Sequence, residues 1–204
     1  MKTAEEICKA LNIDHSQILN IYPYGSKIYG TATEDSDDDY VIVYRSSLLP
    51  SGAFKDNAIS SEDKMIQGTC YSRGGFIDAL NNYQITALEC LYLPDELVVQ
   101  KKMNFKMYKF DDKEFIKSII EQASAAWYRG TQSYKKKNIE FAKKHTFHAL
   151  RILMFAMQIK KRGAIDNYGR ANDIKKEIYD VEDEKYRPRM YLGEFMRLSK
   201  HLKY

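Results

Sequence analysis

The chain has 204 residues, of which 44% are hydrophobic, and it contains 16 Tyr and 9 Phe. That length is enough to bury a core as one large domain or two small ones, and the aromatic content argues against disorder over most of it. The net charge is only +4, but residues 1–100 carry 7 Lys and Arg against 15 Asp and Glu, a net of −8. Residues 101–204 carry 25 against 13, a net of +12.

This uneven charge predicts that the two halves have different ligands: the first half binds a metal and the second half binds phosphates or nucleic acid. The alternative is that the second half is helical and uses Lys as a solubilising helix former, which would explain much of the excess.

Membrane insertion and zinc binding are not expected. No apolar stretch approaches the ~18 residues that a membrane span needs. The N-terminal segment MKTAEEICKALN is amphipathic with paired acids, unlike a signal peptide, so we expect a cytoplasmic protein. Cys8, Cys70 and Cys90 form no CxxC pair and are expected to be reduced, buried thiols.

The first half of the chain predicts a helix, three strands and two further helices. Thr3 to Glu6 form a capping-box pattern that begins the first helix. Residues 46–63, with Pro, Gly and several Ser, predict a mobile connection. Residues 97–99 add a short strand or line the core. The expected elements, in chain order, are a helix at 4–11, strands at 17–24, 38–44 and 64–71, and helices at 73–82 and 84–92.

From Asp111 onward the apolar residues recur at helical spacing. Asp111 or Asp112 is expected to cap the first of these helices. A second helix is expected at 133–162, ending at Gly163, and two more at 170–180 and 190–202. The predicted fold class is therefore α+β, with a small mixed β-sheet at 1–108 followed by a C-terminal helical bundle at 109–204.

Residues 24–43, YGSKIYGTATEDSDDDYVIV, contain two aspartates at the head of an apolar strand. Side chains alternate along a strand, so Asp37 and Asp39 point the same way and Asp38 points opposite. The repulsion between two converging carboxylates is usually offset by a hard cation such as Mg²⁺, which also takes oxygen ligands from substrate phosphates. The segment predicts a metal site at Asp37 and Asp39.

The Gly-Ser pair upstream predicts a phosphate site beside it. Gly25 allows a tight turn and a close approach to a ligand, and the Ser26 hydroxyl with neighbouring amides can donate to phosphate oxygens. The competing interpretation is an acidic, solvated surface turn, EDSDDD, between two strands.

These elements together resemble the signature of the DNA polymerase β superfamily of nucleotidyltransferases. The apolar strand 18–24 ends in Gly25-Ser26, ten residues intervene, and Asp37-Asp38-Asp39 leads into a second apolar strand at 40–44. The resemblance implies that the mixed sheet is a polymerase β-like palm.

Two further stretches narrow the resemblance to a bacterial and phage group of nucleotidyltransferases, some associated with RNA repair. Residues 71–94, YSRGGFIDALNNYQITALECLYLP, are similar to the segment that follows the third strand in that group. Lys144, His148 and Arg151 resemble its helical K-x3-H-x2-R pattern. The resemblance spans residues 17–165.

The same three residues also have a physical argument. Lys144, His148 and Arg151 are spaced i, i+4 and i+7, and therefore form one stripe on a largely apolar helix. A triphosphate would suit them, with Arg151 gripping oxygens bidentately, Lys144 acting as a point charge and His148 binding or orienting the nucleotide. The alternative is a basic face exposed to water, with His148 hydrogen-bonded to the backbone.

One position departs from the superfamily pattern. A third carboxylate usually completes the metal site and can accept the proton of the attacking hydroxyl, and the matching position here is Gln67. Glutamine is neutral and cannot act as a base. Three explanations stay open: Asp63 or Glu62 reaches the site, metal alone activates the nucleophile, or the protein binds nucleotide without efficient transfer.

The resemblance implies a nucleotidyltransferase that moves a nucleoside monophosphate from a triphosphate, with ATP favoured, to an acceptor hydroxyl and releases pyrophosphate. Asp37 and Asp39 would hold one or two Mg²⁺ (or Mn²⁺) ions in a two-metal mechanism, and Gly25, Ser26 and Ser36 would hold the outer phosphates. An RNA 3′ end is the favoured acceptor. The alternatives are a non-catalytic nucleotide- or RNA-binding regulator and one member of a toxin–antitoxin pair.

Overall fold

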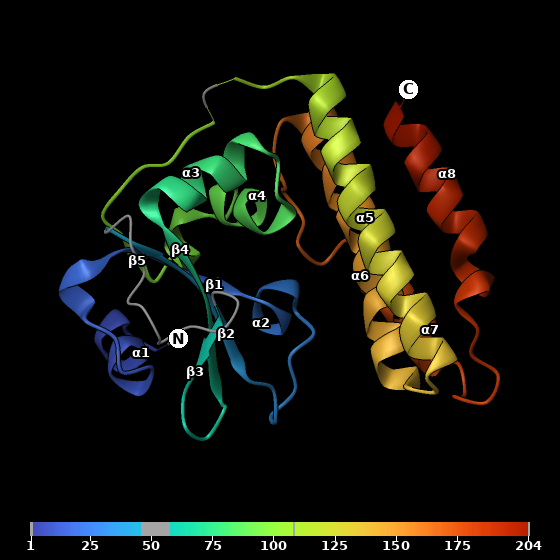
Figure 1. Ribbon diagram of the computed structural model, residues 1–204, viewed down its shortest axis with the longest axis horizontal. Coiled ribbons are helices and arrows are strands. Elements are labelled where there is room, and N and C mark those ends of the chain that lie inside the picture. The colour runs from blue at the N-terminus through green and yellow to red at the C-terminus, as the bar shows by residue number, and fades with distance from the viewer. Residues whose placement is uncertain (1, 46–57, 108, 204) are drawn as a thin grey trace. The chain divides into compact units, whose positions relative to one another are not determined.

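The computed structural model describes residues 2–45, 58–107 and 109–203. The chain forms two compact units, Met1–Asn81 with Thr86–Lys109 and Asn82–Ile85 with Phe110–Tyr204. A five-stranded mixed sheet lies in the first unit and long helices make up the second (Figure 1), so the predicted α+β class is confirmed.

The sheet consists of β1 (Ile18–Tyr24), β2 (Asp38–Tyr44), β3 (Ala58–Ser60), β4 (Ile66–Ser72) and β5 (Gln100–Lys101). Their order is β3-β4-β2-β1-β5, and only β2 and β4 run parallel among these strands. The strands predicted at 17–24, 38–44 and 64–71 are thus confirmed within two residues.

Helices cover both faces of this sheet. The helix α1 (Ala4–Ala10) begins with the predicted capping box, in which Thr3 and Glu6 satisfy each other's backbone amides. Ile7 and Cys8 of this helix belong to one core cluster with alternate residues of β2 and β4, such as Ile42. On the opposite face, Phe76 of α3 (Arg73–Asn81) stacks on Tyr22 with ring centroids 5.8 Å apart.

The helix α4 (Ile85–Leu91) follows α3 and ends before the 3₁₀ turn η2 (Asp95–Leu97). Another 3₁₀ turn, η1 (His15–Gln17), leads into β1, and α2 (Ser26–Tyr29) follows that strand.

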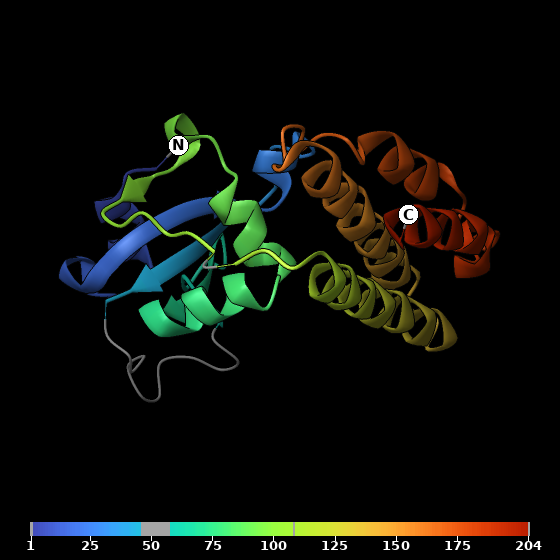
Figure 2. The same ribbon diagram turned by 90° about the horizontal axis from the view of Figure 1, so that it is seen from above.

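The second unit is built from α5 (Asp112–Lys135), α6 (Ile139–Arg162), α7 (Asn172–Asp180), the 3₁₀ turn η3 (Pro188–Tyr191) and α8 (Leu192–Lys203). Asp111 caps α5 by accepting hydrogen bonds from the amides of Lys113 and Glu114. The helices α5 and α6 lie side by side, as Figure 2 shows from above. Gly130 permits this contact, because a Cβ there would lie 2.9 Å from Thr146 Oγ1.

The predicted start of the second long helix, at residue 133, was wrong. The helix α5 continues to Lys135, and α6 begins only at Ile139. Lys137 takes a left-handed φ of 60°, and the Asn138 side chain accepts a hydrogen bond from the amide of Phe141. This cap restarts the helix directly after the polar run 135–138, KKKN.

The predicted connection at 46–63 was also partly wrong. Residues 46–57 lie outside the described residues, but residues 58–60 form β3 and pair antiparallel with β4. Residues 97–99 were expected to form a short strand or to line the core. Leu97 ends the turn η2, Val99 packs against the core cluster, and the short strand β5 follows at Gln100.

The expectations for the thiols hold. Cys8, Cys70 and Cys90 are free and buried, and burial raises the pKa of Cys8 to about 11 and that of Cys70 to about 12. None of the helices in the described parts of the chain is long and apolar enough to cross a membrane.

Candidate functional site

The Gly-Ser turn joins β1 to the short helix α2. Gly25 has a φ of 74° and a ψ of −151°, a conformation that side chains with a Cβ rarely adopt. A Cβ at Gly25 would also lie 2.9 Å from Cγ of Asp39. The turn therefore needs glycine both for its backbone conformation and for the close approach of the Asp39 carboxylate.

Asp39 lies in register with Tyr24 of β1 and Gln67 of β4. Cross-strand partners share a face of the sheet, so these three side chains project on the same side. Gln67 Nε2 donates a hydrogen bond to Asp37 Oδ2. The structure thus brings Asp37, Asp39 and Gln67 together at the head of β2, with an amide where an acid was expected.

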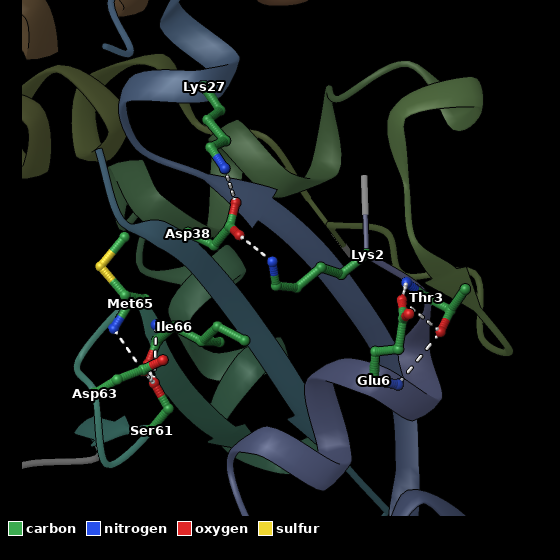
Figure 3. Close-up of polar contacts among 9 residues, drawn as sticks. All are labelled: Lys2, Thr3, Glu6, Lys27, Asp38, Ser61, Asp63, Met65 and Ile66. Atoms are coloured by element: carbon green, nitrogen blue, oxygen red, sulfur yellow. Dashed lines mark hydrogen bonds and ion pairs between the residues drawn. The ribbon is translucent and has the colours of Figure 1, made fainter. Parts of the chain in front are cut away.

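Asp63 is held in the turn between β3 and β4. Its carboxylate accepts hydrogen bonds from Ser61 Oγ and, at 3.0 Å, from the amide of Met65 (Figure 3). Glu62 is exposed in the same turn. The hydrogen bonds of Asp63 are to residues of its own turn, whereas Gln67 contacts Asp37 directly. Gln67 is therefore the residue that stands beside the predicted metal pair.

Asp38 belongs to the opposite face, as the strand alternation predicts. Its carboxylate is paired with Lys27 and, at 3.2 Å, with Lys2 (Figure 3). Burial by itself raises the pKa of Asp38, but hydrogen bonds and charge from the two lysines outweigh it and hold the pKa below its ordinary value. Asp38 therefore has a structural role, and sequence reasoning missed both of its partners.

The two serines of the predicted site differ. The Ser26 Oγ atom is buried, and among the described residues it has no hydrogen-bond partner. Buried hydroxyls are normally paired, so Ser26 is suited to a ligand. The Ser36 hydroxyl accepts a hydrogen bond of 2.8 Å from the amide of Thr33 and closes its own turn.

Asp37 and Asp39 offer hard oxygen ligands, which suit Mg²⁺. Across residues 2–45, 58–107 and 109–203, no group of three or more His, Cys, Asp or Glu is arranged to hold a metal ion. The donor set therefore fits a cation held by two carboxylates and by substrate phosphates, which is the usual mode for Mg²⁺.

In the second unit, the predicted stripe lies on α6. Lys144 is exposed, His148 is half-buried and Arg151 is buried, with 8% of its surface exposed. Arg151 Nη2 donates to His148 Nδ1 at 3.0 Å. Because a guanidinium can only donate, Nδ1 is the acceptor and the imidazole proton resides on Nε2. The alternative prediction paired His148 with the backbone, but the partner of its Nδ1 atom is the Arg151 side chain.

The stripe is strongly basic. Burial, followed by the positive charges of Arg151 and Arg129, lowers the pKa of His148 to about 3. The Arg151 guanidinium also lies over the Phe147 ring, 5.5 Å from its centroid. Burial and Arg151 likewise lower the pKa of Lys175 on α7. His148 is therefore a neutral N–H donor at pH 7, surrounded by cations.

One buried acid was missed by sequence reasoning. Glu89 of α4 is 2% exposed and accepts hydrogen bonds from Tyr29 Oη at 2.5 Å and Tyr24 Oη at 3.4 Å. The available signal was a single charged residue inside the apolar run TALECL.

Comparison with solved structures finds the spectinomycin adenyltransferase AAD(9) from Enterococcus faecialis, solved with ATP and spectinomycin. The TM-score is 0.53 and the identity 11%, over 100% of both chains. The chain therefore shares the fold of this adenyltransferase. No family model and no curated protein matches its sequence.

Proposed function

We propose that the protein is a nucleotidyltransferase that transfers a nucleoside monophosphate from ATP to an acceptor hydroxyl, with an RNA 3′ end as the favoured acceptor. The observation that carries the proposal is the packing of Asp39 against Gly25, which joins the acidic strand head to the Gly-Ser turn. The fold shared with an adenyltransferase supports the same assignment.

In the first unit, Asp37 and Asp39 would hold one or two Mg²⁺ ions. When bound, Mg²⁺ would neutralise the charge of the phosphates and of the attacking and leaving oxygens. The Ser26 hydroxyl, which has no hydrogen-bond partner in the described part of the chain, and the amides that follow Gly25 would donate to the outer phosphate oxygens. We assign Ser36 a secondary role, because its hydroxyl already contacts Thr33.

In the helical unit, Lys144, His148 and Arg151 would bind the nucleotide. His148 would donate through Nε2–H, because its Nδ1 is occupied by Arg151. Lys144 would contribute a mobile point charge. We propose that these roles are divided between the two predicted domains, 1–108 and 109–204.

In the transfer, the acceptor oxygen forms a bond to the α-phosphorus as the bond from that phosphorus to the pyrophosphate oxygen breaks. The acceptor hydroxyl must also lose its proton. Gln67 cannot accept it, so we expect either Asp37 or Asp39, or solvent, to do so. This predicts slower transfer than a site with three carboxylates would give.

The test uses ATP labelled at the α-phosphate or at the γ-phosphate, Mg²⁺ or Mn²⁺, and total cell RNA or protein. Label transferred from the α-position to RNA, with none from the γ-position, would support the proposal. Label transferred to protein instead would support the nucleotidyl transfer but show that the acceptor is a protein and not RNA.

A regulator that binds without catalysis is the second candidate, and the Gln67 amide beside Asp37 is the observation that favours it. Tight, Mg²⁺-dependent ATP binding with no label transfer to any acceptor would establish it in place of the transferase.

A further inference from the structure

Two tyrosines bracket the Gly-Ser turn. Tyr24 is the last residue of β1 and Tyr29 is the last residue of α2, so Gly25 and Ser26 lie between them. The two rings meet edge to face, with centroids 5.9 Å apart and an interplanar angle of 77°. The ends of the turn are therefore in contact with each other.

Both phenols also donate to one carboxyl group. Tyr29 Oη lies 2.5 Å from Glu89 Oε2, and Tyr24 Oη lies 3.4 Å from Glu89 Oε1. The Tyr24 hydroxyl is also 3.4 Å from Thr86 Oγ1, one turn earlier on α4. The carboxylate of Glu89 thus fixes both ends of the turn to the same helix, and all of these residues belong to the first unit.

Stability alone gives little reason for an acid at this position. Ala87, Leu88 and Cys90, the neighbours of Glu89 along α4, are all buried and apolar. Desolvating a carboxylate is costly, and an apolar side chain of similar size at such a site often stabilises a fold equally well or better. A buried carboxyl group with two directed phenol donors instead specifies the geometry of the residues it holds.

We propose that Glu89 is a positioning residue for the phosphate-binding turn. It holds Tyr24 and Tyr29, and through them it fixes Gly25 and Ser26 in the conformation that receives the nucleotide phosphates. This inference rests on the proposed function, because it takes the turn to bind the nucleotide phosphates. Glu89 itself is assigned no contact with the ligand. Small displacements of positioning groups weaken binding and catalysis strongly, which gives the carboxylate a measurable effect.

The first measurement needs no nucleotide. The amides of Tyr29 and Thr31 donate to Gly25 O at 3.2 Å and to Ser26 O at 2.9 Å, so their hydrogen exchange reports the order of the turn. In Glu89→Gln and Tyr29→Phe we expect these two amides to exchange about tenfold faster. The matched control is Tyr22→Phe, which removes a buried hydroxyl from the same strand, bonded to Asn20 at 2.6 Å and not to Glu89.

The second measurement is ATP binding with Mg²⁺ by calorimetry on the same full-length variants. Glu89→Gln and Tyr29→Phe should weaken ATP binding by about tenfold, a typical effect of losing an orienting group. Tyr22→Phe should bind within about twofold of the wild type even where its melting temperature falls equally.

The outcomes separate the two proposals. A wild-type protein that binds no ATP would overturn the proposed function together with this inference. Wild-type binding that Glu89→Gln and Tyr29→Phe both retain would overturn the inference alone, as would equal losses in the Tyr22→Phe control.

Discussion

At the scale of residues, the head of β2 separates two roles by strand alternation. Asp39 packs on Gly25 and lies in register with Gln67, whereas Asp38, one residue earlier, is paired with Lys2 and Lys27 on the opposite face. Of these neighbouring acids, Asp38 is neutralised by lysines, whereas Asp37 and Asp39 lie on the face that we propose binds a metal ion.

Replacing Gln67 with an acid should strengthen metal binding. In Gln67→Glu, a third carboxylate would stand beside Asp37 and Asp39, and Mn²⁺ affinity should rise by about tenfold because ligand charge sets the affinity of such sites. Electron paramagnetic resonance of free Mn²⁺ measures this. The control is Thr69→Glu, an exposed position two residues further on β4. An equal rise of Mn²⁺ affinity in both variants would show that the added negative charge acts without direct coordination at position 67.

Asp38 should contribute a pH-dependent part of the stability. Its pKa is lower in the folded protein than its ordinary value, so its stabilising effect is present above pH ~4 and is lost as the pH falls through the folded pKa. Asp38→Asn should cost about 1 kcal/mol at pH 7, because the lysine partners are partly exposed. In urea unfolding, this difference should shrink at pH 3. A difference that stays constant between the two pH values would contradict the pairing.

The sequence revealed the acids and the Gly-Ser turn because these residues are close in the chain and have distinctive chemistry. Glu89 could not be assigned in the same way. It contacts Tyr29 across 60 positions, so its role appears only once the fold brings the two side chains together.

At the scale of elements, the strands and most helices followed from apolar period and capping. The break between α5 and α6 did not, because the lysines at 135–137 are good helix formers. The features that decide it are the left-handed Lys137 and the Asn138 cap. The strand β3 was missed for another reason. It is three residues long and gains its order from pairing with β4, which no local pattern encodes.

The contact between α5 and α6 depends on Gly130. A Cβ there would lie 2.9 Å from Thr146 Oγ1 and 3.2 Å from Ala142 O, a backbone atom that cannot easily move. Gly130→Ala should therefore destabilise the protein by about 1–3 kcal/mol, despite the better helix propensity of alanine. Gly193→Ala on α8 is the control, since nothing lies within 4 Å of its Cβ. Chemical denaturation compares them, and equal stabilities would argue against this close contact.

At the scale of the whole molecule, the charge changes sign along the chain. The first 100 residues have a net charge of −8 and the rest +12. The acidic part contains Asp37 and Asp39, and the basic part contains the stripe of Lys144, His148 and Arg151. This distribution agrees with our proposal that the ligands are phosphates and the acceptor is RNA.

RNA binding should consequently depend strongly on salt. With about three phosphate contacts, affinity for a single strand should fall roughly twentyfold between about 50 and about 200 mM salt, because each contact releases counterions. Fluorescence anisotropy with a labelled RNA measures the slope, and ATP serves as the small-ligand comparison. An affinity for RNA that hardly changes with salt would favour a protein or small-molecule acceptor.

The most direct test of the central claim is pyrophosphate release from ATP in the presence of Mg²⁺ and RNA. The wild type should release pyrophosphate, and the double variant Asp37→Asn, Asp39→Asn should release none, since it lacks the carboxylates that hold Mg²⁺. Asp35→Asn, an exposed member of the same acidic run, should behave as the wild type does. Unchanged turnover in the double variant would contradict the assignment of the site.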